Sequence, residues 1–384
     1  MLKIYNSMSL RKEEFRTVEK GVARLYVCGI TPYDTTHLGH AFTYASFDVL
    51  VRYLRFLGYD VIYAQNVTDV DDDILRRADA EKRNWKELGE MWTKRFLSDM
   101  ESLNVIAPTH YVKATGSIGQ MKDIIGALLA KGIAYKSARN VYFDVTKFKE
   151  YGALSHFSEK QMRLLLRERG GDPDDHDKKN PLDFVLWEGT DGDPNWDAPW
   201  GMGRPGWHIE CSAVAREYLG EQIDVHGGGR DLIFPHHESE IAQSESYTGK
   251  RPFSRYFVHT AMVAYMGEKM AKSLGNLVLV LDLLRKYSPN AIRWLLLSHS
   301  YRQMWEYVPE EMDDAQAQVS EMEKMLDGAG GGPGGWQSQS LGQFRKIMDD
   351  DLDTPAALRL AMDLAREGRT DESARILDIL GFRF

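Results

Sequence analysis

Residues 24–29 read Arg-Leu-Tyr-Val-Cys-Gly, an apolar strand pattern that runs directly into the turn-rich residues 31–34. A helical pattern follows over residues 41–58, where apolar side chains recur at helical spacing and Gly58 supplies a natural stop. Asp60–Val67 then reads as a second buried strand. A strand, a helix and a strand in such close succession form a βαβ unit, which predicts an α/β fold with a doubly wound parallel sheet.

The composition is that of an ordinary globular chain: 384 residues, of which 43% are hydrophobic and 27% charged. A chain of this length has about two to three domains. Its apolar stretches fall far short of the roughly 20 residues of a membrane span, and residues 1–20 show no signal sequence, so we expect a cytoplasmic protein that binds no membrane. Two cysteines exclude a disulfide scaffold, and a net charge of −9 gives no global attraction to nucleic acid, although a local basic groove remains compatible with it.

The remaining sequence divides by composition. Residues 72–135 look mostly helical, whereas residues 140–200, rich in Gly, Pro and acidic residues, read as a loop-rich segment inserted into a catalytic domain over residues 1–285. Pro289–Leu297 begins a helical region over residues 286–327, followed by a Gly-rich linker at residues 328–335. We expect one or two helices in residues 336–384.

Both cysteines belong to a candidate metal site. Cys28 ends the first strand, Cys211 follows Trp-His-Ile-Glu, and His236 lies in Phe-Pro-His-His-Glu-Ser-Glu. Two thiolates and one imidazole would leave a tetrahedral zinc ion with an open position. Glu240, four residues after His236, is a candidate fourth ligand that the substrate would displace. The alternative is a pair of buried free thiols with surface histidines, but a strand end is where α/β proteins bind ligands, which favours the metal.

Three further stretches are typical of nucleotide binding. Residues 35–40, Thr-Thr-His-Leu-Gly-His, open the first helix, where backbone N–H groups and imidazoles can approach phosphates. Lys269 and Lys272 lie in a loop that can neutralise pyrophosphate. Residues 226–231, His-Gly-Gly-Gly-Arg-Asp, allow close backbone approach and offer an acid for ribose hydroxyls. Each stretch, taken alone, is also compatible with an ordinary exposed turn.

Taken together, these stretches resemble the class I aminoacyl-tRNA synthetases, through the His-x-Gly-His element at residues 37–40 and Lys-Met-Ala-Lys-Ser at residues 269–273. Residues 26–29, 66–72, 206–211 and 226–240 narrow the resemblance to the cysteinyl group of that class. The resemblance implies a Rossmann-like sheet with an inserted segment and a truncated helical C-terminal domain. It also implies activation of cysteine by ATP, with one zinc ion holding the substrate thiol.

The resemblance further implies roles for individual residues, with ATP arriving as its Mg²⁺ complex. The metal ligands would be Cys28, Cys211, His236 and Glu240. The catalytic residues, which stabilise phosphate charge and close over the leaving pyrophosphate, would be His37, His40, Lys269 and Lys272. The positions expected to bind cysteine or the nucleotide are Cys28, Gly29, Ile30, Thr31, Thr43, Asn66, Val67, Thr68, Trp207, Gly229, Arg230, Asp231 and Val263.

Two activities within this group differ in the acceptor of the activated cysteine. Cysteinyl-tRNA synthetases charge tRNA(Cys), whereas the mycothiol cysteine ligases transfer cysteine to the amine of glucosaminyl-inositol. Residues 28–34, with Pro32, and residues 168–173, Glu-Arg-Gly-Gly-Asp-Pro, look like the ligases, and residues 336–384 are too few for an anticodon-binding domain. We therefore expect a monomeric ligase whose partners are L-cysteine, ATP and glucosaminyl-inositol, with tRNA(Cys) as the alternative acceptor.

Two residues depart from the family pattern. Ala271 replaces the usual serine of the lysine loop, which predicts slower pyrophosphate handling, and Glu240 is more like the synthetases, because the ligases use three protein ligands. A third interpretation is a non-catalytic paralogue that retains the fold as a binding module. It predicts broken catalytic residues, whereas the histidines, the lysines and the three primary metal ligands are all present.

Overall fold

A computed structural model describes residues 1–270, 274–327 and 338–384. Its centre is a five-stranded parallel sheet with the strand order β11-β10-β3-β4-β5. The strands are β3 (Val22–Ile30), β4 (Asp60–Val67), β5 (His110–Lys113), β10 (Ile223–Gly229) and β11 (Ser254–Thr260). The chain builds outward from β3 to β5 on one side and later adds β10 and β11 on the other, so strand order reverses between β3 and β10. A ligand crevice is expected at that reversal.

The predicted βαβ unit is confirmed, as is the doubly wound α/β class. Its helix is α1 (Leu38–Phe56), which begins three residues earlier than expected because His37 caps it. Alternate side chains of β3 enter two different cores: Leu25 and Val27 pack with α1, whereas Tyr26 and Cys28 face the opposite side of the sheet. Burial of both faces explains why the strand reads as a continuous apolar run.

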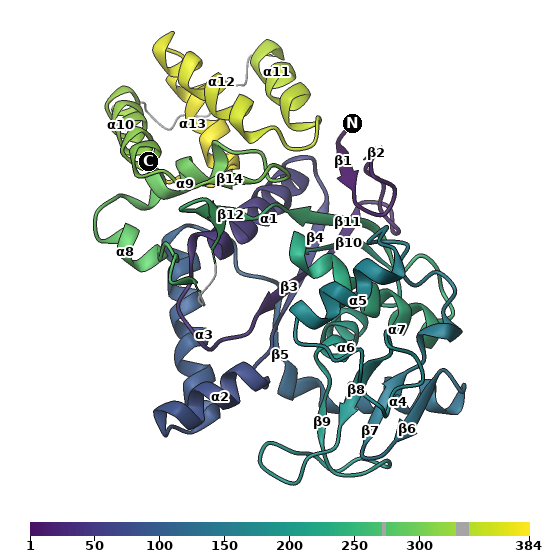
Figure 1. Ribbon diagram of the computed structural model, residues 1–384. Helices are drawn as coiled ribbons and strands as arrows, with labels where there is room; N and C mark the ends of the chain where they lie inside the picture. The colour runs from purple at the N-terminus through teal and green to yellow at the C-terminus, as the bar shows by residue number, and fades with distance from the viewer. Residues whose placement is uncertain (271–273, 328–337) are drawn as a thin grey trace.

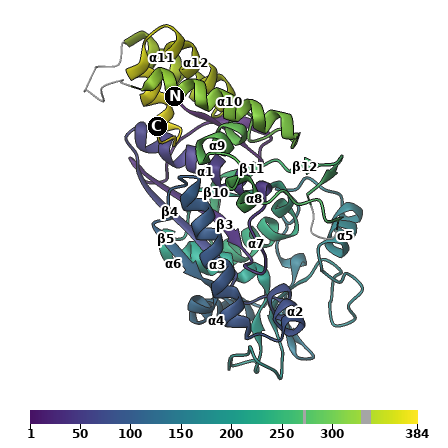
Figure 2. The same cartoon turned by 90° about the vertical axis from the view of Figure 1, so that its left-hand side faces the viewer.

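Helices cover both faces of this sheet (Figures 1 and 2). The opposite core from α1 is formed with helices from the middle of the chain. These are α4 (Ile118–Ala130), α6 (Trp207–Leu219) and α7 (Glu238–Thr248). Helices α2 (Asp72–Glu81) and α3 (Trp85–Ser102) connect β4 to β5. The prediction that residues 72–135 are mostly helical therefore missed β5, a four-residue strand too short to leave a clear period.

Residues 140–200 are more regular than the loop-rich segment that we expected. They contribute to a four-stranded antiparallel sheet, shown at the bottom of Figure 1, and one helix. These elements are β6 (Ala134–Ser137), β7 (Asn140–Phe143), β8 (Phe184–Glu188), β9 (Arg204–Pro205) and α5 (Glu159–Glu168). Phe143 and Trp187 are fully buried in this part of the core. The Gly and Pro residues lie in the connections and concealed the short strands between them.

Several short elements surround the sheet. An N-terminal hairpin pairs β1 with β2, and a three-stranded sheet has the order β13-β12-β14. Their bounds are β1 (Lys3–Asn6), β2 (Arg11–Glu14), β12 (Val263–Tyr265), β13 (Glu268–Lys269), β14 (Trp305–Glu306) and the helix α8 (Val280–Leu284). Strand β13 leads into residues 271–273, so Ala271 and Lys272 lie outside the described residues.

The C-terminal helices gather at one end of the molecule, at the top of both views (Figures 1 and 2). They are α9 (Pro289–Leu297), which begins the predicted helical region, α10 (Pro309–Leu326), α11 (Ser338–Met348), α12 (Thr354–Arg366) and α13 (Thr370–Ile379). Three helices therefore follow the expected linker, where one or two were predicted, and the linker itself lies outside the described residues. Arg293 joins this end to the sheet, because its buried guanidinium pairs with Asp48 on α1 and donates to the Leu380 carbonyl at 2.7 Å. Within the described ranges, no helix is both long and apolar enough to cross a membrane.

Candidate active site

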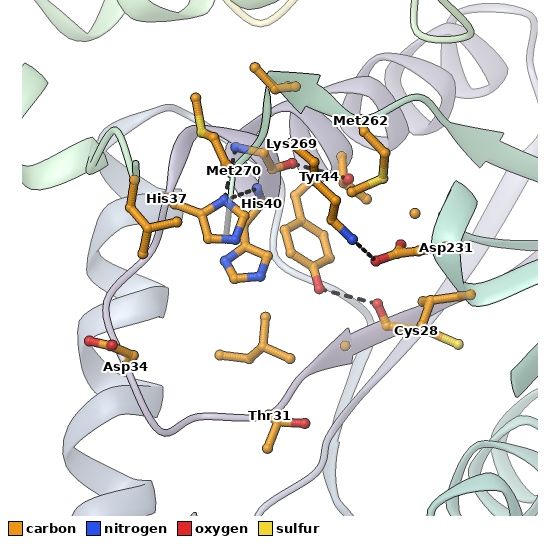
Figure 3. A pocket seen from close by; sticks show the side chains of 18 of the residues that line it. Cys28, Thr31, Asp34, His37, His40, Tyr44, Asp231, Met262, Lys269 and Met270 are labelled. Atoms are coloured by element: carbon orange, nitrogen blue, oxygen red, sulfur yellow. Dashed lines mark hydrogen bonds and ion pairs between the residues drawn. The ribbon is translucent and has the colours of Figure 1, made fainter. Parts of the chain in front are cut away.

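A cavity of about 350 Å³ lies at the predicted crevice, beside the carboxyl ends of β3 and β10 (Figure 3). Its walls come from the loop after β3, the first turn of α1, the residues after β10 and the strands β12 and β13. Twelve of the residues singled out in the sequence line it: Cys28, Gly29, Ile30, Thr31, His37, His40, Thr43, Trp207, Gly229, Asp231, Val263 and Lys269. The structure thus brings together residues from five separate stretches of sequence.

The candidate metal ligands converge at the deep end of β3. The Sγ atom of Cys28 lies 3.9 Å from that of Cys211 and 3.6 Å from Oε1 of Glu240. Nε2 of His236 lies 3.3 Å from the Cys211 sulfur and 3.1 Å from the same Glu240 oxygen. All four side chains are buried, and their donor atoms lie within 4.8 Å of one another. Strand β3, helices α6 and α7 and the helical turn Ile233–His237 before α7 therefore supply a compact S₂NO donor set.

This donor set fits a zinc ion. Zinc–ligand bonds of about 2.0–2.3 Å place the donors of a tetrahedral site about 3.3–3.8 Å apart, close to the separations observed here. Burial raises the pKa of the Cys28 and Cys211 thiols and lowers the pKa of His236 well below its ordinary value. Burial alone thus disfavours the thiolates, and a dication at the centre supplies the charge that stabilises them.

Two further histidines lie beside this set and were missed as possible ligands. Nε2 of His237 lies 3.2 Å from the Cys28 sulfur, and Nε2 of His226 lies 3.2 Å from Oε2 of Glu240. With Cys28 and Glu240 they form a second group of donors within 4.8 Å of one another. The sequence held a signal in the adjacent His236 and His237, but only the packing of β10 against α7 places His226 there.

His236 is held in place by two aromatic neighbours. The Trp207 ring stacks on the His236 imidazole at 4.2 Å between centroids, and Nδ1 of His208 lies 2.9 Å from Nδ1 of His236. These contacts fix the plane of the ring and direct Nε2 toward the cysteines, as contacts behind a metal ligand commonly do. Trp207 also lines the cavity, so the same side chain contacts the candidate metal ligand and the space beside it.

Behind the cavity wall, a buried hydrogen-bond chain links the loop after β3 to α6. The Gly29 N–H donates to Oδ1 of Asn66 at 2.7 Å, Nδ2 of Asn66 donates to Oγ1 of Thr68 at 3.1 Å, and the Thr68 hydroxyl donates to Oε2 of Glu210 at 2.8 Å. A Cβ at Gly29 would lie 1.7 Å from the Asn66 carbonyl oxygen, so only glycine fits. Asn66, Val67 and Thr68 therefore lie behind the cavity, and Glu210 is an additional residue of this network.

His37 and His40 stand at the N-terminus of α1, as predicted. Nδ1 of His37 accepts hydrogen bonds from the N–H groups of Gly39 and His40, at 3.1 and 3.4 Å, so the neutral ring carries its proton on Nε2. The two imidazoles stack with centroids 3.7 Å apart. Burial, followed by the charges of His40 and Lys269, lowers the pKa of His37 to about 2, and burial lowers that of His40 to about 4. Both rings are therefore neutral hydrogen-bond donors at neutral pH.

An ion pair spans the opposite side of the cavity (Figure 3). Nζ of Lys269 lies 3.0 Å from Oδ2 of Asp231, and both side chains are partly exposed. Arg230, the neighbour of Asp231, lines an adjacent cavity instead of this one. Tyr44, which we did not predict, donates its hydroxyl to the Cys28 carbonyl at 3.1 Å and so supports the loop from inside α1.

Comparisons with known proteins agree with this architecture. The family described as tRNA synthetases class I (C) catalytic domain matches residues 14–317. A relative from Thermobispora bispora, named L-cysteine:1D-myo-inositol 2-amino-2-deoxy-alpha-D-glucopyranoside ligase, is 45% identical over 97% of this chain and 92% of its own. A Cysteine--tRNA ligase from Dehalococcoides mccartyi is 43% identical over 95% of this chain and 80% of its own.

Solved structures show the same fold at low identity. Methionyl-tRNA synthetase from Mycobacterium tuberculosis, in complex with methionyl-adenylate, superposes with a TM-score of 0.66 at 16% identity. The match covers 94% of this chain and 90% of that one. This match covers more of the chain than the family match to residues 14–317, so the shared fold extends into the C-terminal helices.

Proposed function

This chain belongs to the class I (C) tRNA synthetase family, and on that premise we propose that it activates L-cysteine with ATP and transfers the cysteinyl group to the amine of glucosaminyl-inositol. The observation that carries the proposal is the buried set of Cys28, Cys211, His236 and Glu240 beside a cavity that also holds His37 and His40. A thiol-selective metal set and a phosphate-binding helix terminus are what cysteine activation needs in one place.

The donor set explains how cysteine would be distinguished from serine. A pocket that reads shape alone discriminates weakly between near-isosteres. A zinc ion held by Cys28, Cys211 and His236 would supply an attractive partner for a substrate thiolate and a poor one for a hydroxyl. Glu240 lies at the fourth corner, 3.6 Å from the Cys28 sulfur, which is the position that the substrate sulfur needs.

In the activation step, the cysteine carboxylate attacks the α-phosphorus of ATP. Both partners are anionic, so positioning and stabilisation of phosphate charge dominate. Nε2 of His37 and the His40 ring would donate to the phosphate oxygens, aided by the N-terminus of α1. Lys269 and Lys272 would neutralise the pyrophosphate that leaves with Mg²⁺. Asp231 would bind the ribose hydroxyls, which requires Lys269 to leave its present partner.

In the transfer step, the neutral amine of the acceptor attacks the carbonyl carbon of the cysteinyl-adenylate. A C–N bond forms, the C–O bond to the phosphate breaks, and AMP leaves with the electron pair. The nitrogen loses one proton to a base. The products are cysteinyl-glucosaminyl-inositol and AMP.

The acceptor is chosen on residues 28–34 and 168–173, which look like the ligases, and on the ligase name of the Thermobispora relative. A second candidate function, charging of tRNA(Cys), is favoured by one observation: Glu240 lies within the donor set. Relatives named Cysteine--tRNA ligase, including one from Thermococcus onnurineus at 47% identity over 85% of this chain, also support it.

Two measurements test the proposal in sequence. Cysteine-dependent exchange of labelled pyrophosphate into ATP is expected from the zinc-loaded protein, and its absence would contradict activation. The enzyme-bound adenylate is then offered separately to glucosaminyl-inositol and to tRNA(Cys). We expect amide product from the first, whereas charged tRNA without amide would overturn the choice of acceptor in favour of the synthetase.

A further inference from the structure

A second cavity, of about 310 Å³, lies on the other side of Trp207. Its walls come from the turn after α5, the start of β8, the residues before and within the first turn of α6, and the N-terminus of α2. Trp207 lines both cavities, so this one adjoins the space assigned to cysteine and ATP. Its volume is at the small end of the range of about 300–1,000 Å³ for small-molecule pockets.

The lining of the second cavity is polar and of mixed charge. It combines carboxylates, the cations Arg169, Lys178 and Arg204, and the ring of Trp207. A phosphate-rich ligand would be repelled by the carboxylates, whereas hydroxyl groups can donate to carboxylates and accept from the cations. An aromatic wall can in addition pack against the carbon skeleton of a sugar or cyclitol. The lining therefore suits a polyhydroxylated ligand that is neutral or cationic.

Two carboxyl groups near Trp207 retain acceptor capacity. Glu210, only 1% exposed, accepts from the Thr68 hydroxyl through Oε2, and Asp71 caps α2 by accepting from the Asp73 N–H through Oδ1. Within the described part of the chain, the second oxygen of each group accepts no hydrogen bond from protein. By contrast, Arg204 is fixed between Asp72 at 2.5 Å and Glu188 at 2.6 Å, so it shapes the wall.

The opposite wall is tied to the first cavity. Arg169, next to the turn, donates hydrogen bonds to the carbonyls of Asp231 and Phe234, which flank the loop leading to His236. Lys178 donates to the backbone carbonyl of Asp172, which holds the turn closed. The 168–173 stretch therefore forms a wall of this cavity and at the same time contacts the segment that carries Asp231.

We propose that this second cavity is the acceptor subsite, which binds a polyhydroxylated amine with its nitrogen at the Asp71 and Glu210 end, beside Trp207, and its hydroxyl groups toward Lys178 and the 169–172 turn. This rests on the proposed function, because it names where that function's acceptor binds. The amine then lies at the boundary between the two cavities, which is where it must meet the activated carbonyl group.

Three variants test the subsite. Asp71→Asn removes the charge but keeps the α2 cap, because asparagine caps helices as well as aspartate does. Lys178→Met removes the donor at the far end and keeps the length of the side chain. Asp79→Asn is the matched control: it makes the same charge change on the exposed side of α2.

Each variant is measured in two assays. Cysteine-dependent pyrophosphate exchange reports activation, and single-turnover transfer from enzyme-bound cysteinyl-adenylate, over a range of glucosaminyl-inositol concentrations, reports acceptor binding. We expect the half-saturating acceptor concentration to rise at least tenfold in Asp71→Asn and in Lys178→Met, with exchange changed less than twofold. Asp79→Asn should change neither.

The two assays distinguish a wrong subsite from a wrong acceptor. Unchanged half-saturation in both variants, with amide formed by the unsubstituted protein, would overturn the subsite alone. An unsubstituted protein that exchanges pyrophosphate but forms no amide would overturn the choice of acceptor and the subsite with it. Retained exchange in a variant shows that it is folded, so a loss of transfer cannot be assigned to misfolding.

Discussion

The two cavities that meet at Trp207 differ in the charges they offer. The cavity beside β3 and β10 is lined by neutral histidines, the N-terminus of α1 and Lys269, which suit phosphate oxygens, and also by the carboxylates Asp34, Asp73 and Asp231. The cavity toward the inserted sheet is rich in carboxylates, which suit hydroxyl and amine groups. Trp207 lines both cavities, so the histidines and helix terminus of the first meet the carboxylate-rich lining of the second at this side chain. With transfer in the second cavity, as we propose, activation and transfer place different electrostatic demands on adjoining spaces.

We expect the largest effect from a substitution among the candidate metal ligands beside the first cavity. Cys211→Ala removes one of the two sulfurs, and we expect zinc content to fall to a small fraction of one ion per chain. Loss of a direct ligand should exceed the 10- to 100-fold effects typical of residues behind ligands, so exchange should fall more than about 100-fold. Metal analysis and pyrophosphate exchange measure the two effects. Full zinc occupancy in this variant would show that the ligands are assigned wrongly.

A second variant separates phosphate stabilisation from metal binding. His40→Ala should lower the exchange rate about 10²–10³-fold, which is the usual cost of removing one preorganised donor. Zinc content should stay at the unsubstituted level, because His40 lies at the N-terminus of α1 and not in the donor set. The exchange rate and the zinc content are measured on the same preparation of the variant and of the unsubstituted protein. His176→Ala, at an exposed histidine, is the control.

A smaller effect is expected at the ion pair between Asp231 and Lys269. Asp231→Asn would weaken the charged hydrogen bond that we propose to the ribose, worth about 1.5–3 kcal/mol, so the KM for ATP should rise about 10- to 100-fold. Stability should change by less than about 1 kcal/mol, because partly exposed ion pairs contribute little. ATP titrations and thermal unfolding check both expectations. A large loss of stability would mean that the pair holds the fold together.

The last expected effect concerns the pH dependence of stability and leaves activity aside. The pKa of His40 is lowered to about 4 from an ordinary value of 6.5 by burial, so between these values the unfolded chain binds one proton more than the folded chain at this site. Stability should therefore rise with pH across this window by up to about 1.4 kcal/mol per pH unit for this residue. His40→Asn should flatten the slope accordingly. Urea unfolding of the metal-free protein at pH 4.5, 5.5 and 6.5 measures it, and identical slopes would contradict the assignment.

Helices and strands were predicted best from the sequence where a regular apolar spacing extends over many residues. The 19-residue helix α1 and the apolar strands β3 and β4 follow directly from spacing. The four-residue strands β5, β6 and β7 were not predicted. Such short segments show almost no apolar periodicity, and they are stabilised by residues far away in the chain.

The same distinction applies to the site. Cys28, His37 and His40 could be placed from sequence, because a strand end followed by a helix start fixes where they stand. His226, His237 and Glu210 could not be assigned as neighbours of the metal set and the amino-acid pocket. Their positions depend on how β10, α7 and α6 pack together, which no local pattern specifies.

The two sulfurs of the donor set come from residues 183 positions apart. Closing so long a loop is entropically unfavourable until the sheet has formed, so an unfolded chain has no assembled site for the ion. A zinc ion bound at this set would therefore be captured late in folding, after β3 has paired with β10.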